Sequence, residues 1–291
     1  MSALAPGLHL VHKPVGPSSH AVVEDLREPG SPKLCHGGAL DPFASGLLLV
    51  LAGDATRMFP FLHGVPKLYD TEIVWGTETD NDDPGGDVVA EGDPTNLTPA
   101  ILTAALAKYV GWHDQVPPVT SNKRVEGERA YVRVQRGETV VLPACSVYLH
   151  SATWLRHDLP RRSFLRVEVA GGFYVRSLAR ELGRELGCRA HLGTLHRRSI
   201  GPWSDPGPGR GTRTQGEGLL PWCASRKVTT EERDILLAEG SVPRGTLKPA
   251  PWPLPDGFPA PPVRLMYEGR MVAIAPDADP LVPDAVFRKG L

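Results

Sequence analysis

One short segment brings together side chains that could carry out acid–base or metal chemistry. Residues 34–46 read LCHGGALDPFASG, with His36 and Asp41 five positions apart among glycines and other small residues. A carboxylate in such a loop can act as a catalytic acid or base, or it can simply form a turn or cap a helix. A metal site is the weaker interpretation, because His36 and Asp41 are only two possible ligands and no third lies at short spacing.

A second candidate is an arginine at the start of the clearest predicted helix. Arg176 comes two residues after Tyr174 and four after Gly172. Apolar residues follow at helical spacing from 175 to 186, and Gly187 ends the pattern. A cation in this place either extends along the helix surface toward water or pairs with a buried carboxylate or a phosphate.

Two further patterns resemble ligand sites but fit them poorly. Residues 80–91, DNDDPGGDVVAE, have the acidic residues and the glycine of a calcium loop, yet Pro84 stands where a side-chain oxygen is needed. We therefore interpret this segment as an acidic, solvated turn. Gly207, Gly209 and Gly211 have the composition of a phosphate-binding loop, but no strand is predicted before them and the chain has no P-loop motif.

The elements that must position these residues are predicted from periodicity and capping. Helices are expected to begin at Ser18 or Ser19, at Asp54 and at Thr98, and residues 34–46 are expected to form a loop. Strands are expected over residues 7–13, 47–52, 67–76, 163–170 and 191–200. Since strands and helices do not alternate, the pattern predicts an α+β fold with a mixed, largely antiparallel sheet and flanking helices.

Glycine and proline divide the chain. The 291 residues include 31 Gly and 30 Pro, and the prolines are about twice as dense after residue 203. Residues 204–218 are predicted to be a linker or surface loop, and 219–291 a small β-rich module. In this module we expect a helix from Thr229 or Thr230, a hairpin over 264–275 and a proline-rich stretch, 243–262, that is neither helix nor central strand.

The net charge of −1 hides a basic segment. Residues 1–120 carry nine more acidic than basic side chains, whereas residues 121–203 carry eight more basic ones. Such a segment is either a surface for a polyanion or a solvated cationic face. Because the chain shows no apolar run long enough for a membrane helix, no secretory signal and no paired cysteine motif, we expect a cytoplasmic protein with reduced thiols.

Four motifs in chain order resemble the TruB family of tRNA pseudouridine synthases. They are HKPVGPSS at 12–19, CHGGALDPFASGLLLVLAGDATR at 35–57, KLYDTEIVWGTETD at 67–80 and GGFYVRSLARELGRELGCRAHLGTLHRRSIG at 171–201. The sequence departs from the usual family pattern at Cys35, Phe173 and His196. The resemblance covers most of residues 7–203 and implies the pseudouridine synthase fold, and residues 219–291 loosely resemble the family's PUA-like RNA-binding module.

The resemblance implies an isomerase that converts uridine 55 in the T-loop of tRNA to pseudouridine without metal, organic cofactor or guide RNA. Asp41 would attack the base or the ribose of a flipped-out uridine. Arg176 would compensate the carboxylate charge, and Tyr69 would stack on the base and assist proton removal at C5. The other residues that the resemblance places in the site are His36, Tyr174 and Leu195.

The resemblance also assigns parts of the chain to RNA binding. Residues 1–203 would be the catalytic domain, and 117–143 within it align with the family insertion that clamps the RNA stem-loop. Its candidate phosphate contacts are Lys123, Arg124 and Arg129. The partner would be the T stem-loop of tRNA, bound by a monomer, with no membrane association.

Two other interpretations stay open. A catalytically silent RNA-binding protein could use the same scaffold, although the joint presence of Asp41, Tyr69 and Arg176 argues against it. A guide-dependent subunit of a ribonucleoprotein would be expected to carry a long basic tail, which this sequence does not show.

Overall fold

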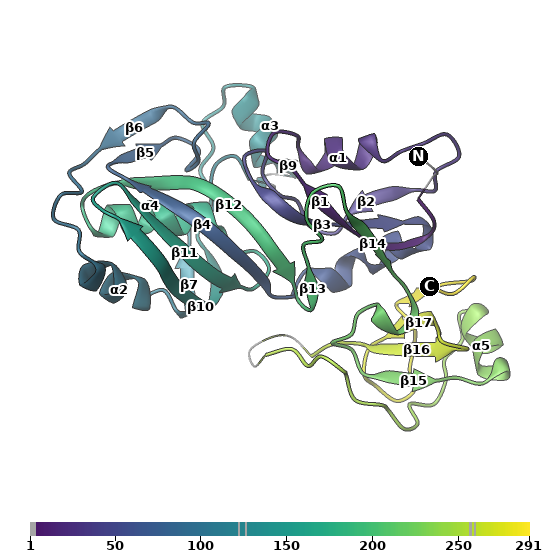
Figure 1. The fold of residues 1–291 in the computed structure, drawn as a ribbon. Helices are drawn as coiled ribbons and strands as arrows, with labels where there is room; N and C mark the ends of the chain where they lie inside the picture. Colours follow the sequence, from purple (N-terminus) through teal and green to yellow (C-terminus); the bar gives the residue numbers. More distant parts are fainter. Residues whose placement is uncertain (1–3, 122, 126, 256–257, 259) are drawn as a thin grey trace. The chain divides into compact units, whose positions relative to one another are not determined.

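The structure is a computed structural model that describes residues 4–121, 123–125, 127–255, 258 and 260–291. Two compact units divide the chain (Figure 1). The first unit comprises residues 1–42, 46–65 and 199–291, and the second comprises residues 43–45 and 66–198. Since the first unit joins both ends of the sequence, the units are not consecutive halves of the chain.

A buried strand is the centre of the N-terminal part of the first unit. The apolar run predicted from sequence forms β3 (Ser45–Ala52), in which every residue from 47 to 52 is completely buried. It pairs antiparallel with β1 (Gly7–Lys13). Two helical segments accompany the strands: α1 (Ser19–Asp25), capped by Ser18, and the 3-10 helix η1 (Gly53–Leu62).

Two strands lie in segments that the sequence predicts to be loops. β2 (Leu34–His36) pairs with β3, and β14 (Gly211–Thr214) pairs with β1, both antiparallel. β14 also interrupts the predicted linker over 204–218. Neither strand has a clear alternation of apolar and polar residues from which it could be predicted. Each forms because a neighbouring strand offers it hydrogen-bond partners.

The C-terminal part of the first unit contains a sheet of its own. Its four strands, in spatial order, are β15 (Ser225–Lys227), β16 (Val263–Tyr267), β17 (Arg270–Ala275) and β18 (Ala285–Val286). The predicted hairpin is confirmed by the antiparallel pairing of β16 with β17. The remaining elements of this unit are α5 (Thr230–Leu237), η2 (Gly216–Gly218) and β13 (Trp203–Ser204).

The helix and the proline-rich stretch of this region also agree with the sequence. Thr229 caps α5 in a capping box with Glu232. The described residues of 243–262 contain neither helix nor strand, and only Lys248 forms an isolated bridge, with Ser225. Trp252 packs against the core, its ring centroid 6.5 Å from that of Trp222.

The second unit is built on a largely antiparallel sheet. In spatial order its strands are β12 (Ala190–Ile200), β4 (Lys67–Trp75), β11 (Arg162–Val169), β10 (Cys145–Asp158) and β7 (Gly111–Gln115). The last two residues of β12 already belong to the first unit and pair with β13. The periodicity of the sequence predicts three of these strands, within one or two residues at each end.

Helices and two small hairpins complete the second unit. α4 (Val175–Glu185) buries its apolar residues as predicted, and α2 (Pro99–Ala107), capped by Thr98, contacts both α4 and β10. The small elements are β5 (Thr77–Thr79), β6 (Val88–Glu91), β8 (Arg124–Val125), β9 (Glu128–Arg129) and α3 (Ala130–Gln135). The α+β fold with a largely antiparallel sheet is thereby confirmed. The division into a catalytic domain, a linker and an RNA-binding module stays a prediction.

None of the helices among the described residues is both long enough and apolar enough to span a lipid bilayer.

The end of α4 allows a direct test of packing in the second unit. A Cβ atom at Gly183 would lie 2.2 Å from the backbone nitrogen of Ala190 and 2.5 Å from the carbonyl carbon of Arg189. Because backbone cannot move aside as a side chain can, Gly183→Ala is expected to lower the free energy of unfolding by about 1–3 kcal/mol.

Urea denaturation measures this loss. Gly211→Ala is the control, because a Cβ atom there would have only the Leu10 carbonyl oxygen within 4 Å, at 3.6 Å. That variant is expected to change stability by less than about 0.5 kcal/mol. Equal losses in the two variants would contradict the packing argument.

Candidate catalytic site

Asp41 follows a residue whose backbone is fixed by a buried serine. Ser19 Oγ donates a hydrogen bond to the Leu40 carbonyl at 2.9 Å and accepts one from the Leu40 N–H at 2.7 Å. Ser19 is only 3% exposed, so water does not compete for these bonds. One hydroxyl therefore satisfies both polar backbone groups next to Asp41.

The residue after Asp41 is held from the same motif. The Pro42 carbonyl accepts a hydrogen bond from the Gly16 N–H at 2.8 Å and one from Lys13 Nζ at 3.3 Å. Lys13 is completely buried, and a buried ammonium group is stable only when its protons are hydrogen-bonded. The motif of residues 12–19 thus holds the chain on both sides of the half-buried Asp41.

A glycine shapes the start of the same loop. His36 is the last residue of β2 and is half-buried. The next residue, Gly37, donates its N–H to the Leu49 carbonyl at 2.7 Å. A Cβ atom at Gly37 would lie 2.8 Å from Leu62 Cδ1 and 3.1 Å from Leu49 Cβ, so this close approach to η1 and β3 requires glycine.

Tyr69 and Leu195 lie in the second unit on neighbouring strands. Tyr69 on β4 is 9% exposed, and Leu195 on β12 is 7% exposed. Between the two strands, Thr71 Oγ1 donates to the Thr194 carbonyl at 2.6 Å. The sheet therefore keeps an aromatic and an apolar side chain in a largely dry setting.

The residue after Tyr69 points to the other face of the sheet, as strand geometry requires. Asp70 accepts two hydrogen bonds from Arg166, at 2.6 and 2.9 Å, and one from Arg198 at 3.0 Å. These guanidinium groups lower the pKa of Asp70 below its ordinary value. The two charged pairs connect β4, β11 and β12, so that they brace the strand that carries Tyr69.

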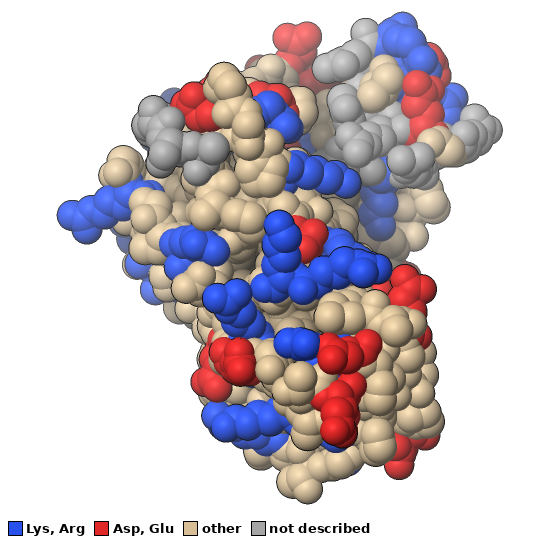
Figure 2. All heavy atoms as spheres, turned by 90° about the vertical axis from the view of Figure 1, so that its right-hand side faces the viewer, with Lys and Arg blue, Asp and Glu red and all other residues tan. Residues whose placement is uncertain are grey.

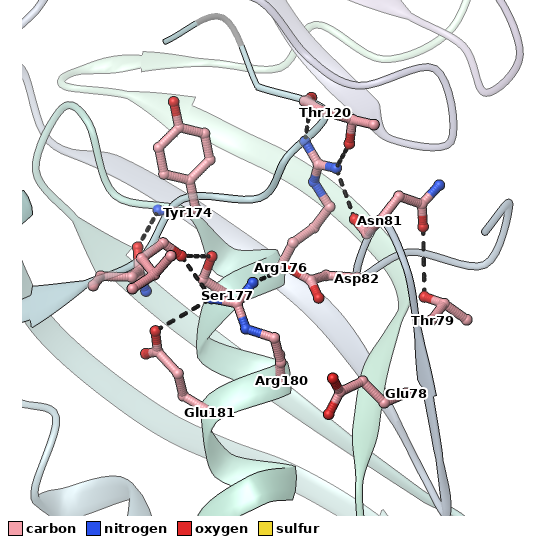
Figure 3. A network of polar contacts seen from close by, with 12 residues as sticks. Glu78, Thr79, Asn81, Asp82, Thr120, Tyr174, Arg176, Ser177, Arg180 and Glu181 are labelled. Atoms are coloured by element: carbon pink, nitrogen blue, oxygen red, sulfur yellow. Dashed lines mark hydrogen bonds and ion pairs between the residues drawn. The ribbon is translucent and has the colours of Figure 1, made fainter. Parts of the chain in front are cut away.

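Arg176 is buried at the start of α4 and surrounded by oxygen atoms (Figure 3). It is 4% exposed, and Nη1 donates to the Asn81 carbonyl at 2.9 Å and to Thr120 Oγ1 at 2.7 Å. Nη2 donates to the Thr120 carbonyl at 3.2 Å, and Asp83 Oδ2 lies 3.6 Å from Nη1. The guanidinium is therefore held in one orientation rather than extended into water.

Tyr174 occupies the position before α4. It is the N-cap residue, and its backbone N–H donates to Gln115 Oε1 at 2.8 Å, whereas its side chain makes no capping hydrogen bond. Gln115 is completely buried at the end of β7. The edge strand of the sheet thus fixes where α4 begins, two residues before Arg176.

The prediction of a solvated acidic turn over 80–91 is wrong for Asp82, and residues 88–91 form β6, whereas most of the other residues are exposed. Asp82 is 2% exposed, and its Oδ2 lies 2.5 Å from Arg180 Nη1. Burial raises the pKa of Asp82 to about 6, although Arg180 acts in the opposite direction. Asp82 is buried because Arg180 of α4 needs an acceptor there, which the local sequence of the turn does not reveal.

The spacing of the arginines on α4 is the sequence feature that could have predicted the burial of Asp82. Arg176, Arg180 and Arg184 follow one another at intervals of four residues and therefore lie along one face of the helix. Each meets an oxygen of the segment 78–82: Arg184 pairs with Glu78 at 2.6 Å. Three cations on one helical face predict that an acidic segment packs against them. The segment that does so is 78–82, at the end of the motif KLYDTEIVWGTETD and just after it.

The structure assigns the predicted site residues to the two units. His36 and Asp41 belong to the first unit, and Tyr69, Tyr174, Arg176 and Leu195 to the second. Of the predicted phosphate contacts, Lys123 is half-buried. The backbones of Arg124 and Arg129 lie in β8 and β9, but their side chains lie outside the part of the chain that the structure describes.

Within the described ranges, His, Cys, Asp and Glu side chains nowhere gather in threes as a metal site would need.

Comparison with known families now adds to this geometry. The model of the TruB family pseudouridylate synthase N-terminal domain matches residues 27–175, just over half of the chain. The chain belongs to the TruB family. The family resemblance predicted from the four sequence motifs is thereby confirmed.

Curated proteins named tRNA pseudouridine synthase B are similar to about two thirds of the chain. A tRNA pseudouridine synthase B of Xanthomonas campestris pv. campestris strain 8004 is 40% identical over 201 residues, which cover 69% of this chain and 65% of that protein. The tRNA pseudouridine synthase B of Thermobifida fusca is 38% identical over 209 residues, covering 69% of this chain and 71% of that one. The chain thus spans slightly less than two thirds of the length of the Xanthomonas relative.

Solved structures confirm the fold. The chain aligns with one in a Cbf5-Nop10-Gar1 complex at a TM-score of 0.70 and 19% identity, covering 97% of this chain and 86% of that one. A second match is to an H/ACA RNP bound to a substrate RNA containing 2'-deoxyuridine, with a TM-score of 0.68, 18% identity and coverage of 97% and 84%. At these identities the likeness concerns the fold alone.

The role of the Ser19 hydroxyl in holding Leu40 can be tested by mutation, with the neighbouring Ser18 as a control. Ser19→Ala removes the hydroxyl that binds both the N–H and the carbonyl of Leu40. This variant is expected to destabilise the protein by about 1–3 kcal/mol. It should also speed hydrogen exchange of the Leu40 amide. Ser18→Ala instead removes the cap of α1, where Ser18 Oγ accepts from the Ala21 N–H.

The two serine variants are expected to give opposite exchange patterns. Ser18→Ala should speed exchange at Ala21 and cost about 0.5–2 kcal/mol, while Leu40 stays protected. Site-resolved hydrogen exchange, by NMR, distinguishes them. Protection of Leu40 that survives Ser19→Ala would show that another group holds the backbone next to Asp41.

Proposed function

We propose that the protein is a tRNA pseudouridine synthase that isomerises uridine 55 in the T-loop of tRNA. The observation that carries this proposal is the placement of Asp41, whose neighbours on both sides are tied to residues 13–19 in a member of the TruB family. The names of the curated relatives, tRNA pseudouridine synthase B, support tRNA as the substrate.

In the proposed reaction Asp41 is the nucleophile. Its carboxylate attacks either the uracil ring or the ribose C1′, the bond between N1 and C1′ breaks, and the freed uracil turns. A bond then forms between C5 and C1′, the carboxylate is released, and the proton on C5 is lost while N1 gains one. No atom is gained or lost overall. As the family resemblance implies, the proposal includes no metal and no organic cofactor.

The second unit would supply the base pocket and a cation. Tyr69 and Leu195 offer an aromatic ring and an apolar side chain on which a flipped uracil can stack, and Tyr69 is the group proposed to assist proton removal at C5. Arg176, whose guanidinium is permanently charged, would stabilise the carboxylate of Asp41 in its ionised form. His36 and Tyr174 would support the displaced nucleotide.

Basic surfaces support binding of a polyanion. Figure 2 shows one face on which Lys and Arg side chains gather across the middle, while Asp and Glu lie mostly around them. The first unit also has an open hollow of about 600 Å³ whose lining includes Arg213, Arg270 and Lys289. Because phosphates dominate the affinity of proteins for RNA, such surfaces can offset the cost of flipping a base.

The organisation proposed for the chain follows from this function. Residues 1–203 form the catalytic domain, with 117–143 as the clamp on the T stem-loop, and 219–291 form a PUA-like RNA-binding module. The enzyme acts as a cytoplasmic monomer and needs no guide RNA. A transcript of the T stem-loop alone is therefore its expected minimal substrate.

Replacement of the nucleophile tests the reaction. Asp41→Asn is expected to lower kcat for pseudouridine formation in a T stem-loop transcript at least about a thousandfold, because the amide is not a nucleophile. The Kd for the transcript should stay within about threefold, since phosphate contacts dominate affinity. Tritium release from C5-labelled uridine measures the rate.

The control is Asp25→Asn, at an exposed carboxylate of α1 in the same unit. It is expected to keep the wild-type rate. An Asp41→Asn variant as active as the control would exclude Asp41 as the nucleophile. A wild-type protein that leaves uridine 55 unmodified, without guide RNA or added metal, would exclude the proposed function.

The salt dependence of RNA binding tests the clamp. Replacing Lys123, Arg124 and Arg129 together by Gln is expected to reduce the slope of log Kd against log salt by about two to three, because each phosphate contact contributes close to one. The matched control replaces three exposed cations elsewhere: Arg27, Lys33 and Lys108. If both triple variants change the slope equally, the effect is one of net charge and the phosphates are bound elsewhere.

A further inference from the structure

The orientation of Arg176 depends on two separate segments of the second unit. Asn81, in the turn after β5, provides one carbonyl acceptor, and Thr120 provides a hydroxyl and a carbonyl. These segments are 39 residues apart in the sequence. Their oxygens can orient the guanidinium only if both segments are held in fixed positions with respect to α4.

The turn that carries Asn81 has a conformation that needs support. Asp82 has a φ of +64°, a left-handed backbone conformation that costs a non-glycine residue about 1–2 kcal/mol. Its carbonyl accepts from the Leu192 N–H of β12 at 3.1 Å, and its N–H donates to the Thr79 carbonyl at 3.2 Å. The side chain of Asp82 adds a charged contact, with Arg180 Nη1 at 2.5 Å.

Arg180 also reaches the other segment. Its Nη2 donates to the Val116 carbonyl at 2.6 Å, and the same carbonyl accepts from Ser177 Oγ at 2.8 Å. Arg180 is 8% exposed and lies one helical turn after Arg176. A single buried guanidinium thus connects the turn at Asn81 with the segment that leads to Thr120. Figure 3 shows Arg180 on α4 beside Asp82.

We infer that the Asp82–Arg180 ion pair positions Arg176 for the reaction, by holding the Asn81 and Thr120 oxygens that orient its guanidinium. This inference rests on the proposed function, because the reaction provides its readout. Asp82 and Arg180 are positioning residues: both are buried, and each acts through the oxygens that contact Arg176.

The electrostatics of the pair predict how it responds to pH. Burial raises the pKa of Asp82 to about 6, and the charged groups that act on it are Arg180, Arg176 and Arg184 of α4 and Glu78 of β5. Burial also raises the pKa of the neighbouring Glu181 to about 7. As pH falls from 7 to 5, Asp82 takes up a proton and its attraction for Arg180 weakens, so that kcat should fall on the acid side.

A double-mutant cycle tests the inference with the full-length protein and a T stem-loop transcript. Asp82→Asn keeps the size of the side chain but removes its charge, and it is expected to lower kcat about tenfold or more while KM changes less than about threefold. Its acid limb should move to lower pH. Asp87→Asn is the control, because Asp87 is an exposed aspartate five residues after Asp82, and this variant should keep the wild-type kcat.

The decisive comparison is made in an Arg176→Lys background. If Asp82 acts through Arg176, Asp82→Asn lowers kcat less than about twofold there, because the oriented guanidinium is already lost. The same fold loss in both backgrounds overturns the inference, and so does a wild-type kcat in Asp82→Asn. Circular dichroism and the thermal midpoint verify that each variant is folded.

A second variant covers the case in which Asp82→Asn does not fold. Arg180→Lys keeps the charge, but a single amine cannot reproduce the two-sided contact with Asp82 and Val116. It should give the same loss of kcat and the same dependence on Arg176. If the wild-type protein is inactive, both the proposed function and the inference are overturned. If the wild-type protein and Asp87→Asn are active and Asp82→Asn is equally active, only the inference is overturned.

Discussion

A buried guanidinium must find acceptors for its N–H groups inside the protein, and this requirement organises the second unit. Arg176 and Arg180 are both almost completely buried, so that desolvation would make them costly without the oxygens of Asn81, Asp82 and Thr120. The turn after β5 takes up a left-handed residue to provide them. The helix α4, the turn after β5 and the segment before Thr120 therefore depend on one another for their conformations.

The same requirement acts on the first unit at a smaller scale. The ammonium group of Lys13 is completely buried and donates to the carbonyls of Pro14 and Pro42, and the buried hydroxyl of Ser19 binds both backbone groups of Leu40. Each bond satisfies a polar group that burial would otherwise leave without a partner. As a consequence, the position of Asp41 follows from the hydrogen bonds of residues that carry out no chemistry.

Much of the fold was predictable because its signals are local. The apolar run of β3, the caps of α1, α2 and α5 and the hairpin of β16 and β17 can each be read within a short window of sequence. Where the prediction differed, the determining partner was far away in the chain. β14 forms by pairing with β1, some 200 residues earlier, and Asp82 is buried because Arg180 lies opposite, 98 residues later.

The sequence by itself determined the types of the main elements, the family and the identity of the candidate groups, since motifs such as ALDP and FYVR are contiguous. Only the tertiary structure decided that Asp82 of the acidic turn is buried, which oxygens hold Arg176, and that Ser19 and Lys13 hold the residues beside Asp41. These contacts join segments whose separation in sequence bears no relation to their distance in space. Their cause is the need of buried charges and polar backbone groups for hydrogen-bond partners, which arises only once the chain has folded.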